Sequence, residues 1–588
     1  MRKKLDRKWV WLILVVVGLV VFANSLPNNF VWDDEEQVVN NTLVHSLKNL
    51  PYFFSGSTFN TGGASGLSGM YYKPLMTVAF ATMHGLFGPR AMGFHAVQIG
   101  LHILNAILVY LFFKELYGRL SFKKNKISTQ LTSWLALLGA VVFLIHPLNV
   151  ETVVYVSSMQ DILFFLFGIG ATLVMMKKEV KFKWLFAVFG GLLFSLLSKE
   201  TGIVWVVFIP IVAWILQRSF WKKWSLVVSG VSFTVYAFLR FAVAGVGLEK
   251  HGLSPITQMS FTERLWSVPK IVVYYLQNYL WPNKLAISQH WVVKGASWKA
   301  VSWNEFYLPL LIVFLVGMGL LWVGWKLWQN SNEWRRVFGV FFILFCLGMG
   351  IHLQIFPLDM TVADRWFYLP QLGLWGMVSL LFLRWGSQVC FGWKRKVLVG
   401  LVGLVLVALS IRSMVRNRNW RDGLTLYSHD IKIAVDSFDL ENNFGVELYR
   451  VGRKEEAKVH FTRSTELADH WWTNWSNLGV IIEEEGDLET AAVYYQRAID
   501  NGQYFLAFQN LARVKALRNP EAAIVFIKDS LELLPYNAEL YKWWAVAEYE
   551  LENKDAALQI LQRSFELAPS QKTAQLYWLM DQGEELEF

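Results

Sequence analysis

Four consecutive acids, Asp33-Asp34-Glu35-Glu36, follow Phe30-Val31-Trp32 soon after the first long apolar run of the chain. Carboxylates in such a cluster can hold a divalent metal, act as a general base, or stay hydrated in a loop. Ionised groups beside a bilayer are costly unless they are paired or hydrated, so each one is a candidate for function. Their position next to an aromatic anchor favours a functional site over a hydrated loop.

A second polar pattern lies within the apolar stretch at 91–113. His95, Gln98, His102 and Asn105 are spaced by three, four and three residues, which places them within about 80° of arc on a helix. Such a stripe must face protein or water rather than lipid. A hydrogen-bonded seam between helices would account for Gln98 and Asn105, whereas His95 lies near one end, where a substrate can reach it.

Further polar residues mark the ends of other apolar runs on the same expected face of the membrane. Each of them can form a structural ion pair, but together they indicate an outward-facing polar cavity. The chain contains no zinc-ligand spacing, Walker loop, Rossmann glycine pattern or serine elbow. The residues of this group are His146, Glu151, Asp161, Lys199, Glu200, Arg240, Asp364, Arg365 and Tyr368.

The elements that position these residues are expected to be membrane helices. Of 588 residues, 54% are hydrophobic and only 17% are charged, against about 25% charged residues in soluble proteins. The 43 Phe, 29 Trp and 21 Tyr exclude a disordered chain. Segments 74–88 and 265–281 carry polar interruptions, so we expect helices at the interface there. Eleven other apolar runs are predicted to cross a bilayer: 9–25, 91–113, 133–148, 153–176, 184–198, 201–217, 224–245, 305–325, 337–356, 366–383 and 397–414.

The net charge of +10 records membrane topology rather than binding to nucleic acid. With the basic start MRKKLDRK inside, the predicted inner loops hold 24 Lys and Arg and the outer loops hold 11, as the positive-inside rule requires. Eleven crossings then place the C-terminal tail outside. The two cysteines, Cys346 and Cys390, are too few for a disulfide framework or a metal site.

The charged tail repeats itself every 34 residues. A repeat of this length, with small residues at the helix crossing and Pro at the end, is the tetratricopeptide pattern. Four units at 437–470, 471–503, 504–537 and 538–571 would form a solenoid that binds an extended peptide or a partner protein. The alternative is a scaffold that only packs against the membrane domain. The recurring pairs include Asn443 and Asn477, Gly445 and Gly479, Ala457 and Ala491, Phe461 and Tyr495, and Pro535 and Pro569.

Several short motifs together resemble one family, the transmembrane and tetratricopeptide repeat-containing O-mannosyltransferases of the GT-C glycosyltransferase superfamily. The order of a membrane domain (1–415), a linker or capping helix (416–436) and repeats (437–588) is similar to that family, although Lys73 stands where eukaryotic members usually have Arg. The short tail and loops look more like the bacterial relatives. The motifs are Phe30-Val31-Trp32-Asp33-Asp34, Tyr72-Lys73-Pro74-Leu75, Phe94-His95 with His102 and Asn105, His146-Pro147 with Glu151 and Asp161, Ser198-Lys199-Glu200-Thr201-Gly202, and Ala363-Asp364-Arg365-Trp366-Phe367-Tyr368-Leu369-Pro370.

The resemblance implies an all-helical enzyme that transfers a sugar, mannose or another hexose, from a polyprenyl-phosphate carrier to an extracytoplasmic protein. Asp33 or Asp34 would be the general base, and a set of four cations would bind the donor phosphate. The donor sugar or the acceptor would contact the other polar residues at the helix ends. Whether Asp33 to Glu36 hold Mg²⁺ or Mn²⁺ stays open. The four cations are Lys73, Lys199, Arg240 and Arg365.

Two alternatives to this function belong to other classes. One is a non-catalytic membrane scaffold whose repeats recruit envelope proteins, and the other is a glycosyltransferase that acts on an envelope glycan or lipid. A transporter is disfavoured, because transporters place their sites near the middle of the membrane. In each case we expect an integral protein of the bacterial cell membrane, with the N-terminus in the cytoplasm.

Overall fold

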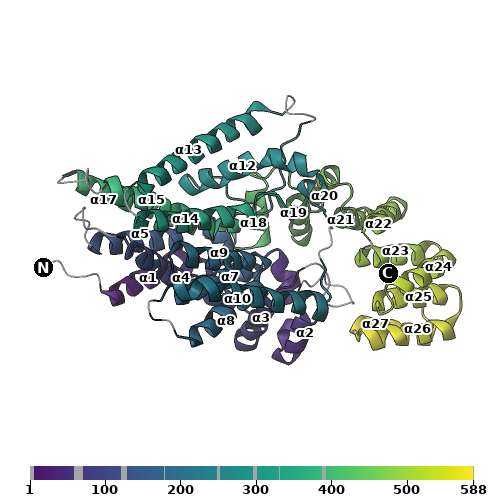
Figure 1. The fold of residues 1–588 in the computed structure, drawn as a ribbon. Helices are drawn as coiled ribbons and strands as arrows, with labels where there is room; N and C mark the ends of the chain where they lie inside the picture. Colours follow the sequence, from purple (N-terminus) through teal and green to yellow (C-terminus); the bar gives the residue numbers. More distant parts are fainter. Residues whose placement is uncertain are drawn as a thin grey trace. The chain divides into compact units, whose positions relative to one another are not determined.

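A computed structural model describes residues 6–58, 71–120, 129–177, 179, 181–247, 252–295, 301–329, 332–386, 393–502 and 504–586. The described residues form helices and loops, with one isolated bridge between Gln289 and Val362 and no strand. The chain divides into two compact units, and the second unit begins at Asp436. The predicted all-helical fold, an apolar bundle followed by a repeat solenoid, is confirmed (Figure 1).

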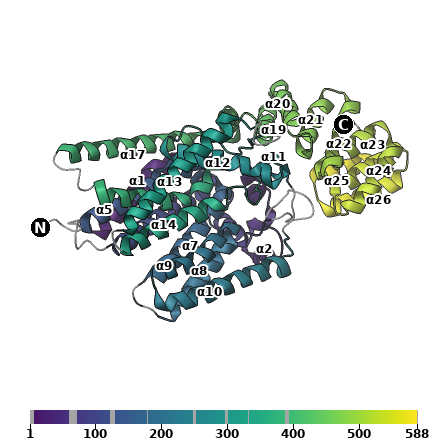
Figure 2. The same ribbon diagram turned by 45° about the horizontal axis from the view of Figure 1, so that its top comes forward.

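The first unit packs long helices side by side, with close neighbours α4 and α5, α7 and α8, α9 and α10, and α14 and α15 (Figure 2). Three short helices in its described loops are α2 (Leu50–Phe54), α6 (Val150–Val154) and α11 (Pro255–Gln258). The long helices are α1 (Arg7–Phe22), α3 (Pro74–Phe87), α4 (Ala91–Tyr117), α5 (Thr129–Ile145), α7 (Met159–Met176), α8 (Lys183–Ser198), α9 (Ile203–Ile215), α10 (Ser219–Ala237), α12 (Phe261–Leu280), α13 (Leu308–Trp328), α14 (Asn332–Gly350), α15 (Pro370–Leu381), α17 (Trp393–Asn419) and α18 (Gly423–Asp430).

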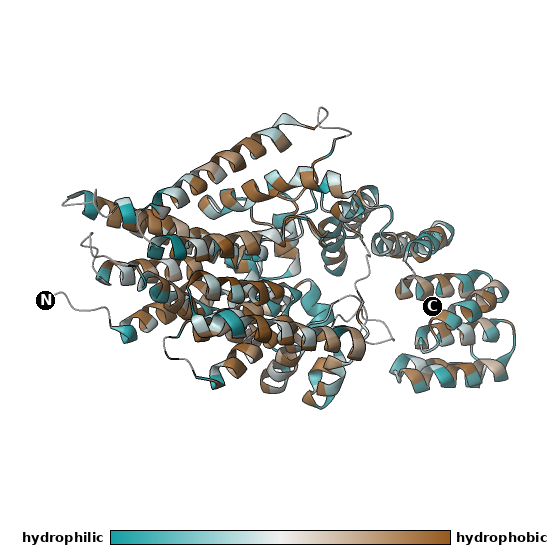
Figure 3. Cartoon of the chain, viewed as in Figure 1, coloured by the Kyte–Doolittle hydropathy of each residue, from teal (hydrophilic) through white to brown (hydrophobic). Residues whose placement is uncertain are grey.

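A helix occupies each of the eleven apolar runs, and this part of the chain is that of an integral membrane protein. In the described residues six helices are long and apolar enough to cross a membrane, and a seventh span results if the bent pair at 130–154 is counted as one. The expected interface helices are present as α3 and α12. Figure 3 shows the apolar residues concentrated in this unit. The number of crossings and their orientation stay predictions.

The segment after the last long apolar helix packs inside the first unit. Arg416 donates two hydrogen bonds to Asp430 at 2.6 and 2.8 Å, and both side chains are buried. Trp420, which lies between these two residues in the sequence, is also fully buried. Asn28, in the loop that leads to the acids, donates to the carbonyl of Asn417 at 3.0 Å. The segment predicted as a linker therefore holds that loop in place.

The second unit consists of four helix pairs and a terminal helix, at the positions expected for tetratricopeptide repeats. At Gly445 and Gly479 a Cβ atom would come within 2.7 Å of the Phe461 and Tyr495 rings, respectively. Only glycine therefore fits at these two positions. The pairs are α19 (Phe438–Arg450) with α20 (Lys454–Leu467), α21 (Trp472–Glu484) with α22 (Leu488–Gly502), α23 (Phe505–Arg518) with α24 (Pro520–Leu533), and α25 (Ala538–Glu550) with α26 (Lys554–Leu567), followed by α27 (Gln571–Gln582).

Candidate functional site

The two adjacent aspartates after Trp32 have different surroundings. Asp34 is fully buried, and its carboxylate accepts hydrogen bonds from the amides of Val31 and Val156 at 3.2 and 3.4 Å. It also accepts from the amide and the hydroxyl of Ser157, each at 2.7 Å. Both oxygens of Asp34 are thus used to hold the first loop against the start of α7.

Asp33 is partly exposed and accepts one hydrogen bond, from the Tyr155 hydroxyl at 2.7 Å. Its neighbour Trp32 has a φ of 57°, a left-handed conformation that is unusual for a bulky residue. The Trp32 ring stacks on Tyr155, with ring centroids 5.4 Å apart, and Tyr155 stacks in turn on Trp420. This aromatic stack supports the strained turn and aims Asp33 away from the loop core. The geometry therefore favours Asp33 over Asp34 as the carboxylate that can react.

Burial raises the pKa of both carboxyl groups. For Asp33 it outweighs the hydrogen bond from Tyr155 and the charge of Arg365, which lower the pKa. For Asp34 burial raises the pKa to about 7, although hydrogen bonds from Ser157 and Val31 lower it in part. A carboxylate with a raised pKa is a stronger base when it is ionised, which suits proton abstraction near neutral pH.

Lys73 is a buried cation that forms no ion pair with a described residue. Its side chain is 8% exposed, and its ammonium group lies 3.9 Å from the centre of the Tyr71 ring. Burial lowers the pKa of Lys73, while the charge of Glu200 raises it and that of Lys199 lowers it again. Its charge also acts on Asp33, so Lys73 and Asp33 belong to one site. A buried ammonium group in this position is suited to receive an anion.

Two further predicted cations are held by buried acids. Lys199 donates to Asp161 at 2.6 Å, and Arg365 pairs with Glu151 through both its side chain and its backbone amide. The Nε of Arg365 and one oxygen of Asp161 are buried without a hydrogen-bond partner. The charge of Arg365 reaches Asp33, and that of Lys199 reaches Lys73. These pairs thus place two more cations at the edge of the same site.

Arg240 is used more fully by the fold than the other cations. It pairs with Glu200 at 3.0 Å and also donates to the Tyr236 hydroxyl and to the carbonyls of Val246 and Gly247. Glu200 in turn accepts from the amide of Tyr72 at 3.2 Å. Arg240 and Glu200 therefore position the Tyr72-Lys73 segment, and this geometry suits them less well to direct contact with a phosphate.

The polar stripe on α4 packs mainly as a seam. The Tyr368 hydroxyl lies 2.8 Å from Nδ1 of His102 and accepts from Asn105 at 3.1 Å. Gln98 donates to the Tyr155 carbonyl at 2.8 Å, directly behind the Asp33 contact. His95 lies 3.2 Å from the Asn28 carbonyl. All four side chains of the stripe are buried, so they support the site through the packing of α4.

His146 and Asp364 are also occupied by the fold. The Nε2 of His146 lies 2.9 Å from the Tyr279 carbonyl, and its ring stacks on Tyr279. Asp364 accepts from the Tyr274 hydroxyl at 2.7 Å. Both interactions tie α12, one of the expected interface helices, to the loops around the site.

Three residues of the site were not predicted from the sequence. The Tyr71 hydroxyl donates to the exposed Asp359 at 3.3 Å, and the charge of Asp359 acts on both Asp33 and Lys73. His352 stacks on Trp366 and is within electrostatic reach of Lys199 and Arg365. Tyr71 and Asp359 flank recognised motifs, and His352 is a lone polar residue in an apolar run, so each carried a weak signal.

The four consecutive acids do not converge on one point. Asp33 and Asp34 have the partners described above. Glu35 and Glu36 begin a short helical turn, in which Glu36 accepts a hydrogen bond from Asn40 at 3.2 Å. Across the described residues, no three His, Cys, Asp or Glu side chains are grouped so that they could hold a metal ion. The residues in place therefore do not fit a metal cluster built from Asp33, Asp34, Glu35 and Glu36.

Comparison with curated proteins found relatives of one kind. No family model matches the chain. It is 22% identical over 463 residues to a protein O-mannosyl-transferase of Caenorhabditis elegans, covering 78% of this chain and 62% of that protein. It is 24% identical over 489 residues to protein O-mannosyl-transferase TMTC4 of Homo sapiens, covering 76% and 65%. The resemblance read from the motifs is confirmed, since the homologues are protein O-mannosyl-transferases of the TMTC type. The chain spans less than two thirds of the length of these relatives.

Two solved structures that align with the chain are an enzyme and a repeat protein. ArnT from Cupriavidus metallidurans, bound to undecaprenyl phosphate, aligns with 91% of this chain and 81% of its own, at a TM-score of 0.34 and 14% identity. The tetratricopeptide protein YrrB aligns with 26% of this chain and 80% of its own, at a TM-score of 0.23 and 18% identity.

Proposed function

We propose that the chain is a membrane glycosyltransferase that moves a sugar from a polyprenyl-phosphate carrier to a hydroxyl group of a protein. The observation that carries this proposal is the partly exposed Asp33 within electrostatic reach of Lys73, a buried cation that forms no ion pair with a described residue. A carboxylate next to an anion-binding cation is the combination that such a transfer requires.

Asp33 takes the proton from the acceptor hydroxyl as its oxygen attacks the anomeric carbon of the sugar. The new glycosidic bond forms while the bond between the anomeric carbon and the phosphate oxygen breaks. Direct displacement of this kind inverts the anomeric configuration. The hydrogen bond from Tyr155 orients the carboxylate, and Asp34 anchors the loop that carries it.

Lys73 binds the phosphate that leaves with the lipid, and Lys199 and Arg365 add positive charge from the edge of the site. Their pairing with Asp161 and Glu151 keeps them in place while no donor is bound. Preorganised cations of this kind stabilise the charge that develops on a leaving group without reorganising during the reaction. Arg240 acts one step further away by holding Glu200 and the Tyr72 amide.

The acceptor is a protein on the outer face of a bacterial cell membrane, and the repeats bind it as an extended segment. The sugar in this proposal is mannose or another hexose. Support comes from the relatives, which are named protein O-mannosyl-transferases, and from the repeat solenoid.

The test compares envelope glycopeptides in a deletion strain complemented with the wild type, Asp33→Asn or Glu36→Gln. We expect a hexose-modified peptide that disappears with Asp33→Asn, since loss of a general base slows transfer by about 10²–10⁴-fold. Glu36→Gln is the matched control, because it neutralises a carboxylate of the same acidic run that accepts a hydrogen bond from Asn40 in its own turn. An identical glycopeptide profile in all strains would favour a non-catalytic scaffold, and a change confined to envelope glycan or lipid would favour the other acceptor class.

A further inference from the structure

Basic residues gather where α7 ends and α8 begins. The Nζ of Lys177 lies 3.7 Å from the centre of the Trp184 ring, and the Nζ of Lys183 lies 5.3 Å from it. Both lysines, named here the groove lysines, are exposed. Phe182 and Phe186 in the same segment are 64% and 68% exposed. This end of the two helices thus combines two ammonium groups with exposed aromatic rings.

Two arginines from other helices reach the same place. Arg119 follows α4 and donates to the carbonyl of Met176 at 3.1 Å, and Arg218 precedes α10 and donates to the carbonyl of Lys177. The two arginines are within electrostatic reach of each other. The fold therefore brings together basic residues of three segments that were each predicted to be an inner loop.

The acids at this end are paired with other cations. Glu115 pairs with Arg119 at 2.8 Å, and Glu179 pairs with Lys181 at 3.2 Å. Within the described part of the chain, neither acid forms an ion pair with the groove lysines. These two ammonium groups are thus available to an anion.

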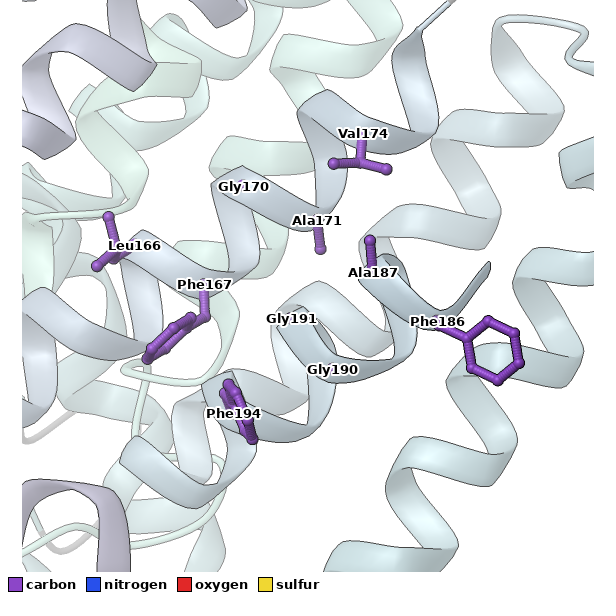
Figure 4. A pocket seen from close by; sticks show the side chains of 10 residues that line it. All are labelled: Leu166, Phe167, Gly170, Ala171, Val174, Phe186, Ala187, Gly190, Gly191 and Phe194. Atoms are coloured by element: carbon purple, nitrogen blue, oxygen red, sulfur yellow. The ribbon is translucent and has the colours of Figure 1, made fainter. Parts of the chain in front are cut away.

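An apolar groove of about 400 Å³ runs along the surface between α7 and α8 (Figure 4). Its lining extends from Leu166 to Val174 on α7 and from Phe186 to Phe194 on α8, which is about 12 Å of each helix. A Cβ added at Gly170 or Gly190, in the middle of the lining, would meet no atom within 4 Å. The groove therefore has room for a narrow apolar chain.

The groove lysines continue the two helix faces that line this groove. Lys177 directly follows α7, three residues after Val174, and Lys183 begins α8, three residues before Phe186. Residues three and four apart share one face of a helix, so each lysine lies one turn beyond the lining and in line with it. The two stripes are Leu166, Gly170, Val174 and Lys177 on α7, and Lys183, Phe186, Gly190 and Phe194 on α8.

This end of the groove is distinct from the candidate active site. Asp161 and Lys199 lie nine residues from Gly170 and Gly190, respectively. Nine residues are about two and a half helical turns, which places that ion pair on the opposite faces of α7 and α8. A ligand at the groove lysines is therefore not the sugar donor, and the inference does not depend on the proposed function.

We propose that the groove lysines and the groove between α7 and α8 bind an anionic phospholipid, with the phosphate at the lysines and one acyl chain along the groove. An anionic head joined to a hydrocarbon chain matches two cations in line with an apolar groove. Basic pockets between membrane helices on the cytoplasmic side are suited to anionic headgroups. A free phosphate ion would use the lysines but would leave the groove and the exposed rings of Phe182 and Phe186 uncovered.

The experiment measures lipids retained by the purified full chain with native mass spectrometry. Phosphatidylglycerol and phosphatidylcholine with the same acyl chains are added in equal amounts, and we expect a preference for phosphatidylglycerol of about tenfold. The double variant Lys177→Gln with Lys183→Gln should lose this preference, whereas Lys177→Arg with Lys183→Arg should keep it. Lys394→Gln with Lys396→Gln removes the same charge from two exposed lysines of α17, so this matched control should behave like the wild type.

Gly190→Leu tests the groove without changing a charge. The leucine fills open space, so retention of phosphatidylglycerol should fall severalfold. Gly230→Leu on α10 is the matched control, because its Cβ also meets no atom within 4 Å and the residue does not line the groove. The melting temperature of each variant in the same detergent separates loss of lipid from loss of fold.

Three outcomes would overturn the proposal. Equal retention of the two lipids by the wild type, or a preference that survives Lys177→Gln with Lys183→Gln, would exclude an anionic headgroup at the groove lysines. Displacement of phosphatidylglycerol by an equal concentration of glycerol 3-phosphate would show a site for free phosphate instead of a lipid. Wild-type retention in Gly190→Leu would exclude the groove as the place of the acyl chain.

Discussion

Charged residues serve different purposes in the two units. In the first unit several ion pairs are buried and join different segments of the chain, such as Glu151 with Arg365 and Arg416 with Asp430. In the repeats many pairs are exposed and join neighbours on one helix, such as Arg453 with Glu456. A buried pair cannot exchange its partner for water, so it determines geometry, whereas an exposed pair contributes little.

The largest expected contrast is between one member of a buried pair and one member of an exposed pair. Asp430→Ala leaves Arg416 buried without its partner and should destabilise the first unit by about 3–5 kcal/mol. Glu456→Ala in the repeats should change stability little, since solvent-exposed ion pairs contribute little. Thermal unfolding of the two variants in the same detergent measures the difference.

Acid should abolish the contribution of the buried pair. Burial by itself would raise the pKa of Asp430, but the Arg416 charge and hydrogen bonds outweigh it and hold the pKa below its usual value. The stability from this pair is therefore present above the unfolded pKa of about 3.9 and is lost as the pH falls through the lower folded value. Equal melting temperatures of Asp430→Ala and the wild type at neutral pH would contradict this account.

The next contrast lies within the first loop. Asp34→Ala removes the acceptor for the buried amides of Val31 and Ser157 and should cost about 1–3 kcal/mol of stability. Asp33→Asn keeps the hydrogen bond from Tyr155 and should melt like the wild type. A lower melting temperature for Asp33→Asn than for Asp34→Ala would mean that Asp33 has the structural role and Asp34 the reactive one.

A smaller effect is expected on the pH dependence of transfer. Transfer needs ionised Asp33, so its rate should rise with pH through the raised pKa of Asp33. Tyr155→Phe removes a hydrogen bond that lowers this pKa, so the acidic limb of the rate profile should move to higher pH. Tyr549→Phe in the repeats serves as control, because the Tyr549 hydroxyl donates to the Glu584 carbonyl. An unmoved limb would argue against Asp33 as the titrating base.

The smallest effect concerns a turn in the repeats. Gly452 and Gly486 join the helices of the first two pairs at φ values of 80° and 90°, and Glu552 occupies the equivalent turn of the fourth pair at 65°. Glu552→Gly removes this strain and should stabilise the last pair by up to about 1 kcal/mol, whereas Gly486→Ala should destabilise its own turn by about as much. Pulse proteolysis of the full chain in urea measures both, and a destabilised Glu552→Gly would contradict the expectation.

The positions of the helices and repeats followed from local patterns. Apolar runs predicted helices because a helix in lipid must satisfy its own backbone and present apolar side chains. The 34-residue period was readable in part because the first two repeats make the same contact between a glycine and an aromatic ring. The third pair has the shortest turn, since Asn519 alone joins α23 and α24 while the other pairs use three residues.

Local sequence patterns did not predict which aromatic side chains of the repeats are buried. The residues concerned are Trp471, Trp472, Trp475, Tyr541, Trp543 and Trp544. Such aromatic side chains can belong to a contact surface or to the core, and the structure buries Trp475 and Trp543 and half-buries the others. Burial depends on what the rest of the fold places opposite a side chain, so composition alone does not decide it.

The sequence by itself determined the class of this molecule: a set of apolar helices, a repeat solenoid, and acids and cations near the helix ends. Only the tertiary structure decided which charged side chains form ion pairs with each other. The partners of Arg365, Arg240 and Lys199 come from segments 38 to 214 residues away, and long-range pairing leaves no periodic trace in the sequence. For the same reason the sequence did not distinguish Asp33, which is left partly exposed, from Asp34, whose two oxygens are used to build the loop.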